Sequence, residues 1–518
     1  MPPAPPGPVS LDPLGARDEA YVRNNSGRFA ESSQFFENIV QRSRGDEAAV
    51  AEGLANQGLQ QSNLGNFTAA ARLFGEAETH IARSDGVAQR LLRNYRALDA
   101  LNRRNPTAAI NALALPVATV DRGYNESELR QGIITNPLSA QINRENVALQ
   151  RLGGIEPGLT GAERAELLDA QARAIEGIAA RRQGRLEEAD RALAEADRRI
   201  GLVRDGRVVS ARWLRSEIGI ERALIAEAAG RPQDAARAYD QAILAITQAY
   251  PNSPTLLATQ ARKAAFLARS GDTPGARALY ADVVERSENV ADSGPVLREL
   301  LAPYFALLAS DGSGEASAAL FRASQVLQRP GVAQTQAILA REMSEGSDEA
   351  SSLFRLSLGR SREIARTEAE IAQLSALPTP SARETAQLET SKQTLTVLKS
   401  EQTRMLSQLA AFPRYKTLAP QSLALADLQG KLRPDEAYYK LMAVGANLFA
   451  LWITPEGART FPVEGGVNAL SDEVAMLRDT IVVEENGAPV THPFDVARSR
   501  ALYLKLFAPN RPRPARTA

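Results

Sequence analysis

The chain contains no cysteine among its 518 residues and only two histidines, His80 and His492. The absence of cysteine excludes disulfides, thiolate metal sites and cysteine nucleophiles supplied by this chain. Two histidines far apart in the sequence do not make a multi-histidine zinc site, and we expect each to have a surface or packing role. The sequence therefore predicts no catalytic residue, no metal site and no cofactor, and hence no enzyme activity for this chain.

Aromatic residues are scarce, at 5%, and neither sign of charge is in excess, because 61 Lys and Arg balance 61 Asp and Glu. The even balance predicts no nucleic-acid partner, and no apolar run is long enough to predict a membrane span. Residues 1–15 form a Pro-rich leader that lacks the basic and apolar parts of a signal peptide. This predicts a cytoplasmic location, with a periplasmic or secreted one as the alternative if a signal peptide precedes the leader.

A pattern of small and large residues repeats through the first two thirds of the chain. Each copy has a turn glycine, a small residue seven positions earlier, an alanine five positions later and a large apolar residue nine positions later. The turn glycines and the alanines that follow them are Gly65 and Ala70, Gly184 and Ala189, Gly230 and Ala235, and Gly271 and Ala276. Looser copies surround Arg104 and Asp311. The glycine suits a left-handed turn between two helices, and the small residues allow those helices to cross closely.

This frame resembles the tetratricopeptide repeat (TPR), a helix–turn–helix unit that stacks into an α-solenoid. The resemblance predicts a helical array over residues 16–330, with a capping helix at residues 16–44. It implies a protein or peptide ligand in the groove lined by the first helix of each repeat. The matching groove positions in this sequence are Leu59, Ser62, Asn63, Ile178, Arg181, Arg182, Leu224 and Glu227. The apolar residues Ala55 and Ala174, at positions where relatives that clamp a C-terminal carboxylate carry Lys or Asn, argue against that kind of ligand.

Two long helices and then a change of composition follow the array. Residues 347–412 predict an antiparallel helical hairpin, broken by the Pro378-Thr379-Pro380 turn. After residue 413, strand formers dominate residues 438–444 and 448–454, and residues 459–463 predict a third strand. Helices are expected at 468–481 and 494–507, and residues 510–518 form a structureless tail.

The C-terminal stretch, residues 413–509, resembles the opening of a CHAT domain, a caspase-like domain. The resemblance rests on four stretches of sequence, which are Pro413-Arg414-Tyr415, residues 425–437, residues 448–454 and residues 501–509. It implies a small α+β fragment of a cysteine-peptidase fold. The family's catalytic His and Cys would come later than residue 518, so we expect a truncated domain without catalysis. Strand 448–454 should then expose an edge and a face, which predicts lower solubility for residues 1–518 than for residues 1–412.

Three functions fit the sequence. The first is a protein-binding TPR scaffold joined to an incomplete, non-catalytic CHAT domain. The alternative is a fragment of a longer caspase-like cysteine peptidase that the repeats regulate. In the third, the helical hairpin would mediate assembly, although no particular residue points to it. The sequence specifies no oligomeric state.

Overall fold

The computed structural model describes most of the helical and strand segments of the chain. The described residues are 13–120 except 44, 159–327 except 207, 209, 210, 289, 291 and 292, 348–375, 380–409, 412, and 423–507 except 480–482, 486, 487 and 491–493. His492, the leader up to residue 12, residues 121–158 and the C-terminal tail lie outside them. Over this described part, the protein is mainly helical with a small three-stranded antiparallel sheet near the C-terminus.

The chain divides into two compact units. Unit 1 contains residues 1–259 and 330–419, and unit 2 contains residues 260–329 and 420–518. The boundary between them falls within helix α14, Pro254–Arg269. The sequence placed residues 260–329 in one array with the preceding helices, whereas here they share a unit with the C-terminal strands.

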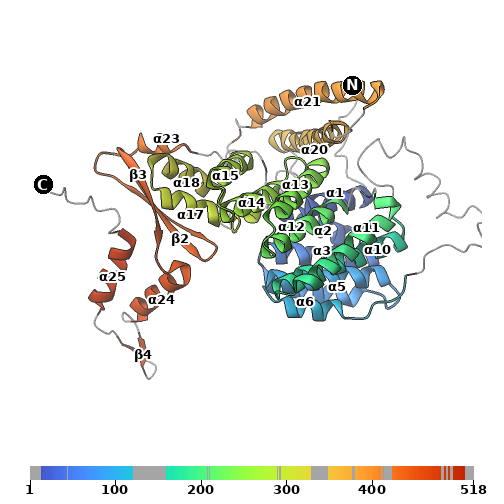
Figure 1. The fold of residues 1–518 in the computed structure, drawn as a ribbon, viewed down its shortest axis with the longest axis horizontal. Helices are drawn as coiled ribbons and strands as arrows, with labels where there is room; N and C mark the ends of the chain where they lie inside the picture. The colour runs from blue at the N-terminus through green and yellow to red at the C-terminus, as the bar shows by residue number, and fades with distance from the viewer. Residues whose placement is uncertain are drawn as a thin grey trace, which may run out of the picture. The chain divides into compact units, whose positions relative to one another are not determined.

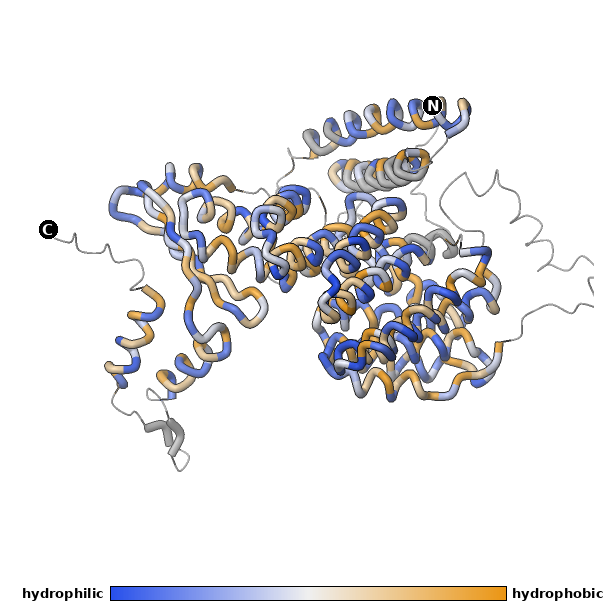
Figure 2. The backbone as a smooth tube through the Cα atoms, viewed as in Figure 1, coloured by the Kyte–Doolittle hydropathy of each residue, from blue (hydrophilic) through white to orange (hydrophobic). Residues whose placement is uncertain are grey.

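Unit 1 consists mainly of helical pairs, in which a first helix is joined to a second by a short turn (Figure 1). The pairs are α1 (Pro13–Asn25) with α2 (Phe29–Arg42), α3 (Glu47–Asn63) with α4 (Phe67–His80), α5 (Gly86–Asn102) with α6 (Pro106–Leu113), α10 (Gly161–Arg182) with α11 (Leu186–Leu202), and α12 (Arg212–Ala228) with α13 (Pro232–Ala249). The 3₁₀ turn η1, Arg204–Gly206, follows α11. Each helix carries both apolar and hydrophilic residues (Figure 2), as expected when one side packs against neighbours and the other meets water.

The predicted turn positions have the expected backbone geometry. Gly65, Gly184, Gly230 and Gly271 all have positive φ, between 71° and 91°. Arg104, the turn of the α5–α6 pair, is also left-handed with φ of 60° although it has a side chain. The left-handed residue therefore follows the sequence frame even where glycine is absent.

Two details of the repeat prediction are wrong. The single capping helix expected at residues 16–44 is instead the pair α1–α2, which turns at Gly27 with φ of 87°. This pair obeys the same frame, because Ala20, Ser32 and Phe36 lie seven before, five after and nine after Gly27 and are all fully buried. In the loosest copy the left-handed residue is Gly312, one position after the predicted Asp311.

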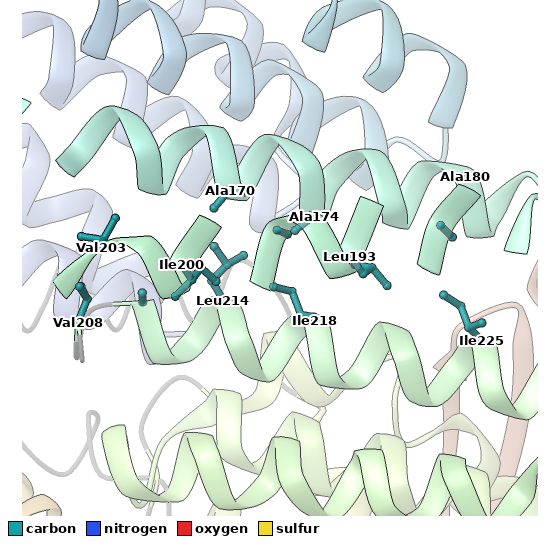
Figure 3. Close-up of a cluster of buried hydrophobic side chains, with 13 residues drawn as sticks. Ala170, Ala174, Ala180, Leu193, Ile200, Val203, Val208, Leu214, Ile218 and Ile225 are labelled. Carbon is teal, nitrogen blue, oxygen red and sulfur yellow. The ribbon is translucent and has the colours of Figure 1, made fainter. Parts of the chain in front are cut away.

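The small residues of the frame are required by close helix crossing. A Cβ atom on Gly58 of α3 would lie 2.5 Å from the ring of Phe74 on α4, and one on Gly177 of α10 would lie 2.8 Å from Leu193 Cγ on α11. Both large residues are themselves buried. Figure 3 shows how the core extends beyond one pair, with side chains of α10, α11 and α12 meeting in one apolar cluster. The large residue of one pair therefore packs towards the next pair.

The predicted helical hairpin is confirmed. Helices α20 (Glu349–Ser375) and α21 (Ala382–Leu409) pack side by side. Arg360 pairs with Glu401 at 2.9 Å, and Gln387 donates to Glu370 at 2.6 Å. From Arg360 to Glu370 the first helix advances along the chain, while the partners of these residues go back from Glu401 to Gln387, so the helices are antiparallel.

Unit 2 combines helices that precede and follow the hairpin with a meander of three strands. Its helices are the end of α14, then α15 (Thr273–Ser287), α16 (Ser293–Leu297), α17 (Ala302–Asp311), α18 (Gly314–Val326), α23 (Leu425–Gln429), α24 (Gly466–Asp479) and α25 (Val496–Phe507). The strands are β1 (Tyr438–Val444), β2 (Asn447–Thr454) and β3 (Gly457–Val463), with β4 (Val483–Glu485) and β5 (Ala488–Val490) as a separate hairpin. The three strands predicted from the sequence are confirmed.

Strand β2 is the centre of the sheet, with β1 and β3 antiparallel on either side. One face contacts α17 and α18, and Phe449 packs on Phe305 with ring centroids 5.7 Å apart. Residues next to each other in a strand point to opposite faces, so Leu448 and Ala450 lie on the other face, where they contact Leu470 of α24 and Leu506 of α25. Helices therefore lie on both faces of the sheet (Figure 1).

This arrangement overturns the expectation that residues 448–454 expose an edge and a face. Both edges of β2 are paired with other strands, and Leu448 to Leu451 are all buried. The sequence interpretation failed because the cover on one face comes from helices α17 and α18, which lie more than 120 residues earlier in the chain.

Candidate functional site: the first helices of unit 1

The predicted groove residues lie near the C-terminal ends of the first helices, next to the turns. Leu59, Ser62 and Asn63 are on α3, Ile178, Arg181 and Arg182 are on α10, and Leu224 and Glu227 are on α12. These helices belong to different pairs, and α5 contacts both α3 and α10 in unit 1. The structure therefore gathers the predicted positions at corresponding ends of neighbouring helices.

On α3, the polar groove residues bond to the following pair. Asn102, the last residue of α5, donates to Ser62 Oγ and to Asn63 Oδ1, both at 3.0 Å. Ser62 is buried, whereas Asn63 is half-buried. The side-chain amide of Asn102 thus links two of the predicted groove residues, Ser62 and Asn63, to helix α5.

The two arginines on α10 link this helix to its neighbours on either side. Arg182 donates to the backbone oxygen of Leu101 on α5 at 2.7 Å. Arg181 forms an ion pair with Glu221 of α12, which is buried. Arg182 therefore links α10 to α5, and Arg181 links α10 to α12.

The apolar groove positions differ in exposure. Leu59 is only 4% exposed and belongs to an apolar cluster with Phe74 and Tyr95, so its side chain is not available to a ligand in this structure. Ile178 and Leu224 are half-buried, and Ile178 packs on the cluster around Leu101. Packing between pairs thus takes up much of the surface that the frame assigned to ligand binding.

A second polar cluster, which the sequence did not single out, lies at Glu52 of α3. Tyr21 of α1 donates to Glu52 Oε1 at 2.6 Å, and Arg164 of α10 donates to the same oxygen at 3.1 Å. Asn56 donates to Tyr21 Oη at 3.1 Å and accepts from Tyr95 Oη of α5 at 2.9 Å. We call Tyr21, Glu52, Asn56, Tyr95 and Arg164 the Glu52 network.

The Glu52 network joins four first helices, α1, α3, α5 and α10. Arg164 and Glu52 are 112 residues apart and belong to pairs that are separated by the α5–α6 pair. First helices two pairs apart therefore meet through these side chains. The polar groups lie largely buried between these helices and satisfy one another's hydrogen bonds.

Burial governs the electrostatics of the network. Burial, reinforced by the charge of Glu52, raises the pKa of Tyr21 well above 10, and burial likewise raises the pKa of Tyr95. Burial alone would lower the pKa of Arg164, but the Glu52 carboxylate together with Tyr21 and Tyr95 outweighs burial, and the pKa is raised. At neutral pH both phenols are therefore protonated donors and the guanidinium is charged.

A third polar cluster lies between α5 and α10. Asp169 accepts from Arg90 Nε at 3.1 Å and from Arg93 Nη2 at 3.2 Å. Asn94, which is fully buried, donates to the backbone oxygen of Leu168 and to Gln171. These contacts again join successive first helices.

The chemistry of these clusters is that of structural hydrogen bonding. In the part of the chain that the structure describes, no group of three or more His, Asp or Glu side chains could hold a metal ion. His80 lies at the end of α4 and contacts Glu47 at 2.5 Å, where both side chains reach solvent. At these clusters the hydrogen bonds and ion pairs fix the positions of neighbouring helices.

The same frame that located the turns could have located part of the missed network. Asn56, Tyr95 and Glu221 each lie nine residues before their turn residue, at 65, 104 and 230. All three are buried and bond to a neighbouring first helix. Polar residues at this position are therefore a signal of contacts between pairs.

Comparison of the chain with models of protein families, with curated proteins and with solved structures gives no match. Among the described residues, no helix has the length and apolar character needed to cross a membrane.

Proposed function

We propose that the helical pairs form a TPR-type α-solenoid that binds a protein or peptide, and that unit 2 carries the opening of a CHAT-like domain. The observation that supports the solenoid is the repeated frame, in which five predicted turns have positive φ and the facing residues Gly58 and Gly177 leave no room for a side chain. Solenoids of this kind present extended surfaces that bind other proteins. Because the chain has no cysteine, it supplies no thiolate for peptidase chemistry.

The surface that we assign to the partner is the row of polar groups at the C-terminal ends of the first helices. Asn63, Asn102, Arg181 and Arg182 bond along this row from α3 to α12, and Glu227 lies at its end. Asn102 and Arg182 are exposed, while the others are half-buried. The row therefore offers amide and guanidinium donors that are fixed in place before a ligand arrives, which lowers the entropic cost of binding.

The proposal is tested by photo-crosslinking in the cells that produce the protein. A photoreactive residue replaces Asn63, Arg182 or Glu227 in separate variants of the full chain. Arg72 on α4 and Asp190 on α11, which are exposed positions on second helices, serve as matched controls. We expect the same polypeptide to be captured from all three first-helix positions and from neither control.

Capture from the control positions to the same extent would refute the assigned surface. Capture of unrelated polypeptides at each first-helix position would refute a single protein ligand. Circular dichroism of each variant checks that the helical content is unchanged, so that loss of capture is not loss of folding.

A further inference from the structure

Strand β1 forms an edge of the three-stranded sheet, and no strand of the described residues pairs with its outer side. The strand order is β1-β2-β3, and β1 pairs along its whole length, Tyr438 to Val444, with β2. Among the described residues, the backbone of β1 makes hydrogen bonds only to β2. Alternate residues of an edge strand direct their N–H and C=O groups outward, so β1 offers these groups for pairing with another strand.

The opposite edge of the sheet is protected. Strand β3 contains Pro462, which has no N–H to donate, and Arg459, which is exposed. Proline and charge on an edge strand both discourage strand addition. Helices α17 and α18 also pack against β3. Strand β1 has no proline, and its one charged residue, Lys440, is half-buried. An inward-pointing lysine disfavours the addition of a strand that leaves the charge unpaired, so β1 admits only a strand that brings an acidic side chain to Lys440.

Lys440 on β1 is half-buried and lacks a counter-ion in the described part of the chain. Its Nζ donates to Ser324 Oγ at 2.8 Å, a neutral partner on α18. Burial lowers the pKa of Lys440. A partly desolvated ammonium without an opposing carboxylate is unfavourable, and a carboxylate placed beside it would offset that cost.

Apolar side chains flank this lysine. Tyr438 lies on the same face of the sheet as Lys440, and Leu441 lies on the other face, because side chains alternate along a strand. Tyr438 and Leu441 are 38% and 39% exposed. A strand laid along β1 would cover both of them.

We propose that β1 binds an extended segment of a partner protein that carries an acidic side chain opposite Lys440 and apolar side chains beside Tyr438 and Leu441. The added strand would form backbone hydrogen bonds with the free edge, which is the mode of strand addition used in peptide recognition. The charge of Lys440 selects the acidic residue. This inference concerns unit 2 and stands independently of the ligand proposed for the helical pairs.

The absence of cysteine from the chain allows a selective test. Ala443 on β1 is exposed, and the variant Ala443→Cys places a single thiol at the edge. Ala443 and Lys440 are three residues apart and lie on opposite faces of the sheet. A probe peptide of alternating valine and threonine with one cysteine and a glutamate three residues from it therefore matches both positions when it extends along β1.

The peptide is supplied as its mixed disulfide with 2-mercaptoethanol and is equilibrated with the full-length Ala443→Cys protein in an excess of 2-mercaptoethanol. The thiolate of the protein displaces 2-mercaptoethanol from the peptide cysteine, so the exchange needs no oxidant, and the disulfide adduct is measured by mass spectrometry. A second peptide carries lysine in place of glutamate. We expect about tenfold more adduct with the acidic peptide, in keeping with a charge-assisted hydrogen bond. A third, acidic peptide with N-methyl groups on alternate residues cannot complete the backbone bonds, and we expect it to lose the advantage.

Further variants isolate the role of Lys440. Adding Lys440→Met should abolish the preference for the acidic peptide, whereas Lys440→Arg should retain it. Lys431→Met, at an exposed lysine of the same unit, should leave the preference unchanged. Equal adduct with the acidic and basic peptides would overturn the proposal. Disulfide-linked dimers of Ala443→Cys in place of peptide adducts would also overturn it, because the occupant of β1 would then be a second copy of the chain.

Discussion

Replacing Tyr95 with phenylalanine tests whether the Glu52 network holds the first helices together. The Tyr95 hydroxyl donates to Asn56 Oδ1 at 2.9 Å, and Asn56 is fully buried. The substitution keeps the ring, which packs in an apolar cluster, and removes one oxygen. Asn56 Oδ1 is then left without a hydrogen bond from the described part of the protein. Leaving a buried acceptor unsatisfied costs about 1–3 kcal/mol, so we expect a loss of stability of about 2 kcal/mol.

The change should be local, because the helical pairs of unit 1 contact mainly the pairs next to them. Hydrogen exchange measured by mass spectrometry resolves it helix by helix. If exchange proceeds through opening of α3 and α5, a loss of about 2 kcal/mol corresponds to about thirtyfold faster exchange in peptides from these helices. Peptides from α17 and α18 in unit 2 should be unchanged.

Tyr304→Phe is the matched control. Tyr304 is a buried tyrosine on α17, and its hydroxyl makes no hydrogen bond among the described residues. Removing that hydroxyl should change stability by less than about 0.5 kcal/mol. If Tyr95→Phe and Tyr304→Phe had equally small effects, the Glu52 network would contribute nothing beyond apolar packing, and the reasoning would be refuted.

Three further predictions follow from packing and charge. Gly177→Ala should lower the melting temperature, because overpacking costs about 1–3 kcal/mol. Gly201 on α11 has open space around it, so Gly201→Ala should leave the melting temperature unchanged or raise it. Although burial raises the pKa of Glu163, its bonds with Arg204 and Thr160 outweigh burial and lower the pKa, so this carboxylate stabilises the fold above its ordinary pKa of 4.5. The destabilisation caused by Glu163→Gln should therefore be present at pH 7 and vanish as the pH falls through the lowered pKa of Glu163. Denaturation of both proteins over a range of pH measures this, and a difference in unfolding free energy that stays constant with pH would contradict the expected sign. Removing residues 413–518 should increase precipitation measured by light scattering, because it uncovers the apolar face of α17 and α18; this reverses the expectation from sequence, and equal light scattering by the two forms would count against it.

Local sequence predicted much of the helical part of the fold. The turns at Gly65, Gly184, Gly230 and Gly271, the α20–α21 hairpin and the three C-terminal strands are all found where their residues indicated. These features depend on short segments, in which a residue that tolerates positive φ or an alternation of apolar side chains directly favours one backbone conformation. The α1–α2 pair was missed because its frame around Gly27 has Ser32 where the other copies have alanine.

The candidate site was predictable only in part. The frame placed Asn63, Arg182 and Glu227 at corresponding ends of their helices, but it did not show that Leu59 is buried or that Arg181 pairs with Glu221. Those outcomes depend on how closely one pair packs on the next. The TPR and CHAT resemblances themselves stay predictions.

The sequence by itself determined most of the helices, most of the turns and the three strands of the larger sheet, because these choices depend mainly on residues close to one another in the chain. Only the tertiary structure decided which of these elements meet. Arg164 reaches Glu52 across 112 residues, and Phe305 covers Phe449 from far earlier in the chain. Such contacts depend on how elements far apart in the chain pack against one another, and no short stretch of sequence encodes that packing.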